Sequence, residues 1–225
     1  MFGGFAGGSN FLNDTWSWDG ATSKWTRVQM KPSPPTATGA MLFTDLLSGR
    51  AMMFGGYNRF KRVPVYNTTW RWTGTSWSKL HPATQPIPRA WGIATPDAVR
   101  KNVVLTGGNG DTIRTDNTWT WDGKNWTQQF PTTQVQALAG AGSAFDPAAK
   151  TVVVFAGFGQ QTGDTNETWS WSGTNWVQMS PTNSPSAREG VGMAYDPISH
   201  QTVAFGGLLA DGTTLVNETW QLVGR

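Results

Sequence analysis

The sequence predicts an all-β fold built from a repeated unit, and three observations support this prediction. The same short motifs recur along the whole chain at a nearly constant interval, which is typical of repeat architectures. The 225 residues include 14 Trp, 27 Gly and 13 Pro, so the chain is rich in large apolar rings and in turn-forming residues. No long window has a period of 3.6 residues, and long helices are therefore not expected.

A pair of glycines after apolar residues marks each repeat, and tryptophan markers follow it. The pair begins at positions 3, 55, 107, 156 and 206, at intervals of 52, 52, 49 and 50 residues, and Ala156 replaces one glycine. A second marker, such as NDTWSW or NETWSW, places a tryptophan in every copy, and four copies carry a further tryptophan. The repeat residues are Gly3, Gly4, Gly55, Gly56, Gly107, Gly108, Gly157, Gly206, Gly207, Trp16, Trp70, Trp119, Trp169 and Trp220.

Each unit is predicted to contain four short strands. Small and apolar residues alternate in the first strand, as in REGVGMAY, and the second is a continuous apolar run such as TVVVFAG, typical of a buried strand. The third strand places Trp169 and Trp171 two residues apart, and hence on one face. A turn such as WDGKNW then closes a hairpin into the fourth strand.

Four strands in about 50 residues is the pattern of a β-propeller blade. We predict a single domain over residues 1–225, a propeller of about five blades of four antiparallel strands. The repeat units are approximately 1–50, 51–102, 103–151, 152–201 and a partial 202–225. First and fourth strands occur only four times, which predicts incomplete blades at the termini. Three alternatives stay open: an imperfectly closed five-blade ring, a four-blade ring with residues 203–222 extra, or part of a longer propeller.

The motifs resemble those of the kelch repeat, and of bacterial kelch variants in particular. The resemblance rests on the Gly-Gly step, the downstream tryptophan, and an arginine that opens the next first strand, present as Arg89 and Arg188. Ala37 and Leu138 occupy that position in two other units, and Trp replaces the family's usual Tyr. The resemblance covers essentially the whole chain. It implies a kelch-like β-propeller whose loops after the Gly-Gly strand and before the first strand surround one mouth of a channel.

Composition argues against several classes of partner. The net charge is only +3, and the 17 Lys and Arg residues are scattered, so no nucleic-acid partner is expected. The chain has no Cys, which excludes disulfides and thiolate metal sites. It contains no apolar run long enough to span a membrane and no signal peptide, so we expect a soluble protein with no membrane partner. Its compartment stays open.

Catalysis finds little support in the sequence. The two histidines, His81 and His200, belong to different repeats and different contexts, so they form no evident acid–base pair. A metal site needs more ligands close together, and no nucleophile lies in a recognisable setting. We therefore predict no enzyme activity, no catalytic residues, no metal and no cofactor.

Periodicity separates structural residues from candidate site residues. The recurring tryptophans are predicted to pack one unit against the next, and the recurring glycines to adopt positive φ. Trp91 differs because it occurs once, where the other units have Gly39, Gly140 and Gly190. A non-periodic tryptophan is a candidate for ligand contact. The candidate ligand-binding residues around the mouth are Asn10, Asn58, Arg59, Arg62, Arg89, Trp91, Arg114 and Arg188.

These residues lead to a first hypothesis of a non-catalytic binding or scaffold module. Its mouth would take a protein or peptide partner, possibly an acidic one, because guanidinium groups pair with carboxylates in bidentate geometry. Arg89 and Arg188 could equally tie loops together, and both roles stay open. The first alternative is a carbohydrate-binding, lectin-like propeller that uses Trp91. The second is an excised or engineered repeat fragment that self-associates through its incomplete blades.

Overall fold

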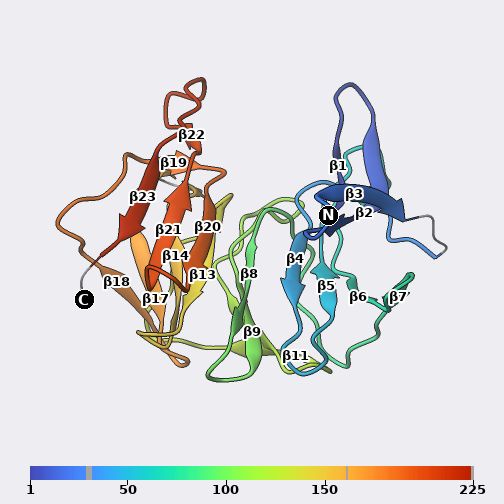
Figure 1. Cartoon of the computed structure of the whole chain (residues 1–225), viewed down its shortest axis with the longest axis horizontal. Helices are drawn as coiled ribbons and strands as arrows, with labels where there is room; N and C mark the ends of the chain where they lie inside the picture. The colour runs from blue at the N-terminus through green and yellow to red at the C-terminus, as the bar shows by residue number, and fades with distance from the viewer. Residues whose placement is uncertain (29–31, 161, 224–225) are drawn as a thin grey trace.

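The computed structural model describes residues 1–28, 32–160 and 162–223, and all of their regular structure is β-strand. Five sheets of three or four strands follow one another along the chain, with two small sheets between them (Figure 1). None of the described residues belongs to a helix that could cross a membrane.

The strands of the first sheet are β1 (Phe2–Phe5), β2 (Phe11–Asp19) and β3 (Lys24–Val28). Those of the second are β4 (Met41–Thr44), β5 (Ala51–Phe54), β6 (Thr69–Trp72) and β7 (Trp77–Lys79). The third has β8 (Ile93–Asp97), β9 (Asn102–Thr106), β10 (Thr118–Trp121) and β11 (Trp126–Gln129), and the fourth has β13 (Gly142–Asp146), β14 (Thr151–Phe155), β17 (Thr168–Trp171) and β18 (Trp176–Met179). The fifth has β20 (Gly192–Asp196), β21 (Gln201–Phe205) and β23 (Thr219–Leu222). The small sheets contain β12 (Leu138–Ala139), β15 (Phe158–Gly159) and β16 (Gly163–Asp164), and β19 (Arg188–Glu189) with β22 (Leu208–Leu209).

Each of the five sheets is an antiparallel meander, which confirms the all-β prediction and its repeated units. Within the described residues, the first sheet has no counterpart of β4 and the fifth no counterpart of β7, as the marker count predicted. β20 pairs with β21 and β21 with β23, so these three strands form a fifth sheet. Figure 1 shows the first and fifth sheets at opposite ends of the molecule.

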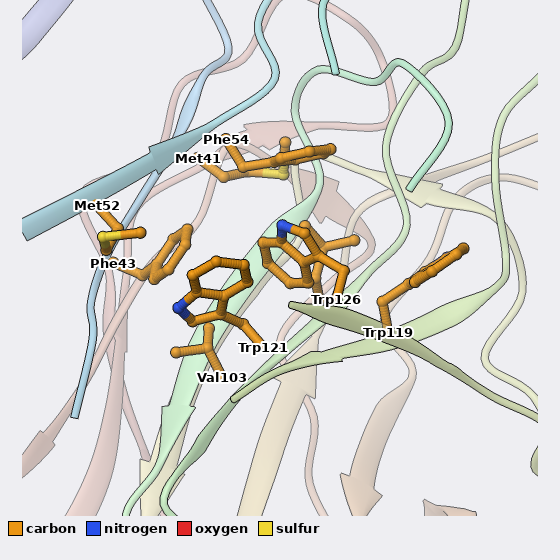
Figure 2. Packing of buried hydrophobic residues seen from close by; sticks show 9 residues of the cluster. Met41, Phe43, Met52, Phe54, Val103, Trp119, Trp121 and Trp126 are labelled. Carbon is orange, nitrogen blue, oxygen red and sulfur yellow. The ribbon is translucent and has the colours of Figure 1, made fainter. Parts of the chain in front are cut away.

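The core lies between neighbouring sheets, and tryptophans are its largest side chains. Figure 2 shows the cluster between the second and third sheets, where Trp121 and Trp126 lie beside Phe43. The ring centroid of Trp126 is 5.2 Å from that of Phe54 and 6.0 Å from that of Phe43. A second cluster, between the third and fourth sheets, repeats this arrangement. The recurring tryptophans of these sheets therefore pack one unit against the next, as predicted.

A periodic hydrogen bond joins each of the second, third and fourth sheets to the sheet before it. The donor is the indole of the tryptophan that opens the fourth strand, and the acceptor is the threonine of the NxTW-type motif in the preceding sheet. Both groups are buried, so the bond satisfies polar atoms that water cannot reach. The bonds run from Nε1 of Trp77, Trp126 and Trp176 to Oγ1 of Thr15, Thr69 and Thr118, at 3.0, 3.0 and 2.8 Å.

The Gly-Gly step is explained by a close approach of two backbones. Gly56 donates its N–H to the carbonyl oxygen of Arg89, in the segment that leads into the third sheet, at 3.0 Å. A Cβ atom added to Gly55 would lie 2.2 Å from the same oxygen, and the φ angles of the two glycines are 73° and 112°. Both conditions favour glycine. The prediction of positive φ at these glycines is confirmed.

The outward faces of the two terminal sheets are open. Trp18 and Trp25 of the first sheet are 51% and 52% exposed, and Phe205 of the fifth sheet is 55% exposed. Phe155, which holds the position of Phe205 in the fourth sheet, is only 4% exposed. The described residues therefore leave apolar surface uncovered at both ends of the row of sheets.

Candidate functional site

Two kinds of loop meet on one face of the molecule. In the second to fifth sheets, the segment that follows the Gly-Gly step pairs with the segment that precedes the first strand of the same sheet, so the two loops of each sheet lie together at one end of it. We call the surface formed by these paired segments the mouth face. The paired residues include Thr38 with Tyr57, Ala90 with Asn109, Ala139 with Phe158, and Glu189 with Leu208.

A row of left-handed residues runs across the mouth face. Gly39, Trp91, Gly140 and Gly190 have φ angles of 64°, 57°, 67° and 69°. Each donates its N–H to the carbonyl oxygen of the one before it, at 2.8 Å in all three bonds. The row therefore ties four units together, and Trp91 holds a position where the other three residues are glycine.

Trp91 is half-buried and packs closely against its neighbours. Its ring centroid lies 5.3 Å from that of Tyr57, and a Cβ atom added to Gly39 would lie 2.7 Å from the indole. A left-handed conformation costs a residue with a side chain about 1–2 kcal/mol. The surrounding contacts hold Trp91 in this conformation, and such strain is concentrated at functional sites in many proteins.

Two hollows meet at Trp91, and Asn109 also lines both. The larger, about 760 Å³, extends toward Gly140, Glu189 and the Gly206–Gly207 step of the fifth sheet. The smaller, about 520 Å³, extends toward Tyr57, Arg114, Phe158 and Gln160. One side chain of the left-handed row therefore contacts both hollows of the mouth face.

Arg114 is held beside the smaller hollow by three contacts. Its Nε donates to Asn109 Oδ1 at 2.8 Å, and a terminal nitrogen donates to the carbonyl oxygen of Gly159 at 2.7 Å. The guanidinium carbon lies 4.2 Å from the ring centroid of Phe158, a cation–π distance. The side chain is thus preorganised, with its charge close to Trp91.

Two carboxyl groups bring negative charge to the same face. The pKa of Glu189 is raised from its ordinary value by partial burial and by the charge of Asp164, although Arg114 acts in the opposite direction. Burial also raises the pKa of Asp164, and its Oδ1 atom is buried without a hydrogen-bond partner among the described residues. The mouth face therefore carries both signs of charge around its aromatic centre.

Two of the arginines predicted for the mouth are buried within the sheets. Arg89 is fully buried, and it donates to Asn117 Oδ1 at 2.7 Å and to the carbonyl oxygen of Gly107 at 3.2 Å. Arg188 is 2% exposed, and it donates to Glu218 at 2.9 Å and to the carbonyl oxygen of Gly206 at 3.2 Å. These bonds tie strands together, which is one of the two roles left open for them.

The other predicted residues lie on a neighbouring loop cluster. Arg59 is exposed, donates to the carbonyl oxygen of Gly8 at 2.9 Å and lies 4.9 Å from the ring centroid of Phe60. Asn58 is 3% exposed and donates to Thr36 Oγ1 at 2.8 Å, so its side chain stabilises the loop. Arg62 and Asn10 are exposed. Of the eight predicted site residues, Trp91 and Arg114 line the hollows described above.

Sequence reasoning missed Tyr57, Asn109, Asp164 and Glu189. A signal for Glu189 was available, because the corresponding positions of the other units hold Thr38, Ala90 and Ala139. The closeness of Asp164 to Glu189 depends on a small hairpin, β15–β16, that has no periodic motif.

No known family model matches the chain, and no curated protein matches it either. Within the described part of the chain, no group of three or more His, Asp or Glu side chains is placed to hold a metal ion. His200 has a left-handed φ of 57° in the turn between β20 and β21, and its Nδ1 lies 3.3 Å from the hydroxyl of Tyr195. Its local role is that of a turn residue.

Proposed function

We propose that the chain is a non-catalytic binding module built on kelch-like propeller blades, and that its mouth face binds a segment of a partner protein. The kelch assignment is supported by the Gly-Gly steps, which closely approach the segment leading into the next sheet, and by Arg89 and Arg188, each of which donates to the carbonyl of the Gly-Gly step in the sheet that follows it. It is also supported by the row of four-stranded meanders. Function has to be argued from the site rather than from the fold.

The observation that carries this proposal is the position of Trp91. A residue with positive φ that is glycine in three units is tryptophan in the fourth, at the junction of both hollows. Neither the repeat nor local backbone preference requires that side chain. A partly exposed, rigidly held indole is the type of residue that dominates binding energy at protein interfaces.

Charge favours a peptide over a neutral ligand. Arg114 lies in one hollow and Glu189 in the other, so a ligand that crosses Trp91 meets both signs of charge. A peptide can offer a partner to each, whereas a neutral sugar would cover charged groups without pairing them. We therefore expect a partner segment of mixed charge, with an apolar or aromatic side chain placed on Trp91.

A carbohydrate ligand is the second candidate, and one observation favours it. The amide side chains of Asn109 and Gln160 line the same hollow as the indole of Trp91. An aromatic face with adjacent amides can stack on a sugar ring and bond its hydroxyl groups.

Replacement of Trp91 by glycine tests the proposal with little risk to the fold, because glycine occupies this position in three other units. Wild-type protein would be used to select binders from a phage-displayed random peptide library and would also be applied to a glycan array. We expect selected peptides to lose at least about tenfold in affinity for W91G, as interface hot spots do. The control is F130A, which removes an aromatic ring that is 81% exposed.

Peptides that bind W91G and wild type equally would contradict the proposal, as would a library that yields no binder. Sugars that bind on the array and are lost with W91G would support the second candidate instead. Cooperative thermal unfolding of W91G is expected, since glycine fits this backbone conformation in the other units, and it would show that any lost binding is local.

A further inference from the structure

The fifth sheet has a place for a fourth strand that no described residue fills. In the second, third and fourth sheets, a tryptophan of the fourth strand inserts between its own sheet and the preceding one, and its indole bonds to a threonine there. β23 is an edge strand of the fifth sheet, and Figure 1 shows it on the outer side of β21. Its free edge is a template for pairing with another strand.

A pocket lies at the position that the missing tryptophan would occupy. Val153, Phe155 and Thr168 of the fourth sheet form one wall, and residues of β21 and β23 form the other. The volume of the pocket is about 50 Å³, much smaller than that of either hollow of the mouth face. The residues of the second wall are Thr202, Ala204, Trp220, Gln221 and Leu222, with Met193 of β20 nearby.

The pocket already contains the polar group that receives the indole elsewhere. Thr168 corresponds to Thr15, Thr69 and Thr118, the three acceptors of the periodic bond, and it receives no side-chain bond from a described residue. Thr202 is 2% exposed, and its Oγ1 has no hydrogen-bond partner in the described chain. Two threonine side chains therefore line the pocket, and Thr168 is the one at the position of the periodic acceptor.

We propose that this pocket and the free edge of β23 form a docking site for an extended peptide segment that carries a tryptophan. The segment extends the fifth sheet through backbone hydrogen bonds to β23, as in other cases of β-strand addition. Its indole enters the pocket between the fourth and fifth sheets and donates its Nε1–H to Thr168 Oγ1. This site is separate from the mouth face and does not depend on the function proposed for it.

The sequence context of the expected segment follows from the repeat itself. The fourth strands read WSK, WTQQ and WVQM after a polar turn, so the tryptophan opens the strand and polar residues follow it. The alternation places the indole in the pocket while its neighbours point to solvent or to the strand edge. A short peptide of this type is therefore an appropriate probe.

Fluorescence polarisation with a dye-labelled peptide of residues 172–180, SGTNWVQMS, tests the proposal on the whole chain. We expect saturable binding, and a loss of at least about tenfold when the peptide's tryptophan is replaced by alanine. The T168V variant removes the acceptor, keeps the side-chain shape, and should weaken binding about five- to tenfold. Its matched control is T127V, at an exposed threonine of the third sheet that lies outside the docking site, which should leave binding unchanged.

A second variant tests whether the peptide binds at the pocket or at another place on the protein. Here the chain continues from Leu222 with the sequence of residues 172–180, so that a covalent fourth strand fills the pocket. We expect this variant to unfold at a higher temperature and to bind no added peptide. The proposal is overturned by an absence of saturable binding up to about 1 mM peptide, by equal binding of the alanine peptide, by equal affinities of T168V and T127V, or by undiminished binding to the extended variant.

Discussion

Removing one periodic indole–threonine bond should destabilise the chain by an amount that the structure sets. In T118V the side-chain shape is kept, but Trp176 Nε1, which lies 2.8 Å from the hydroxyl and is buried, loses its acceptor. A buried donor without a partner costs about 1–3 kcal/mol. In a chain of this length about 2 kcal/mol corresponds to a decrease of roughly 4–8 °C in unfolding temperature. Thermal unfolding followed by tryptophan fluorescence measures the decrease.

The matched control is T219V, at the corresponding threonine of the fifth sheet. Thr219 is exposed and receives no indole from a described residue, so we expect a change within about 0.5 kcal/mol. The background W176F, in which the ring has no N–H group, should remove most of the effect of T118V because the two residues share one bond. Equal destabilisation by T118V and T219V, or an undiminished effect of T118V in W176F, would refute the assigned role of the bond.

Three further predictions test buried and charged groups. R89A should lower the free energy of unfolding by about 3 kcal/mol in urea, through an empty space and unpaired acceptors, whereas R62A should leave it unchanged. T202V, which introduces the residue found at Val152, should raise it by about 1 kcal/mol, because it removes a buried hydroxyl without a partner. The folded chain raises the pKa of Glu189 above its ordinary 4.5, so stability falls as pH rises through the window above 4.5, and the penalty persists at neutral pH. E189Q should therefore gain up to about 1 kcal/mol at pH 7 and nothing at pH 3, as measured by urea midpoints. These predictions fail, respectively, if R89A matches R62A, if T202V destabilises the chain, or if the gain of E189Q does not depend on pH.

The repeat could be predicted because the same backbone and side-chain packing contacts recur in successive units. The Gly-Gly steps of the first four sheets meet the backbone that leads into the following sheet, and each recurring tryptophan of the central sheets fills the same gap, so residue identity follows from position. The left-handed row could also be aligned from sequence, since Gly39, Gly140 and Gly190 fall at equivalent places around Trp91. The strand count, including the incomplete sheets at both ends, followed from the same markers.

The roles of single polar side chains could not be predicted in the same way. Arg89 and Arg114 are both arginines near the mouth, yet one is fully buried against Asn117 and the other stacks on Phe158 at the surface. Sequence position does not distinguish them, because their environment depends on loops from other units. The joint contribution of Asp164 and Glu189 also needs the packing of two separate hairpins.

In a repeat protein, a residue that differs from its counterparts in the other units is informative. Where a position is set by packing alone, neighbouring units converge on the same residue, and a different residue then needs a local cause. Trp91 replaces glycine against its backbone preference and lies between two hollows, while Thr202 replaces the valine of two other sheets and leaves a hydroxyl unpaired in a pocket. Each departure carries a local cost, in backbone strain at Trp91 and in an unpaired buried hydroxyl at Thr202. We propose that ligand binding offsets these costs, at the mouth face for Trp91 and at the edge of β23 for Thr202.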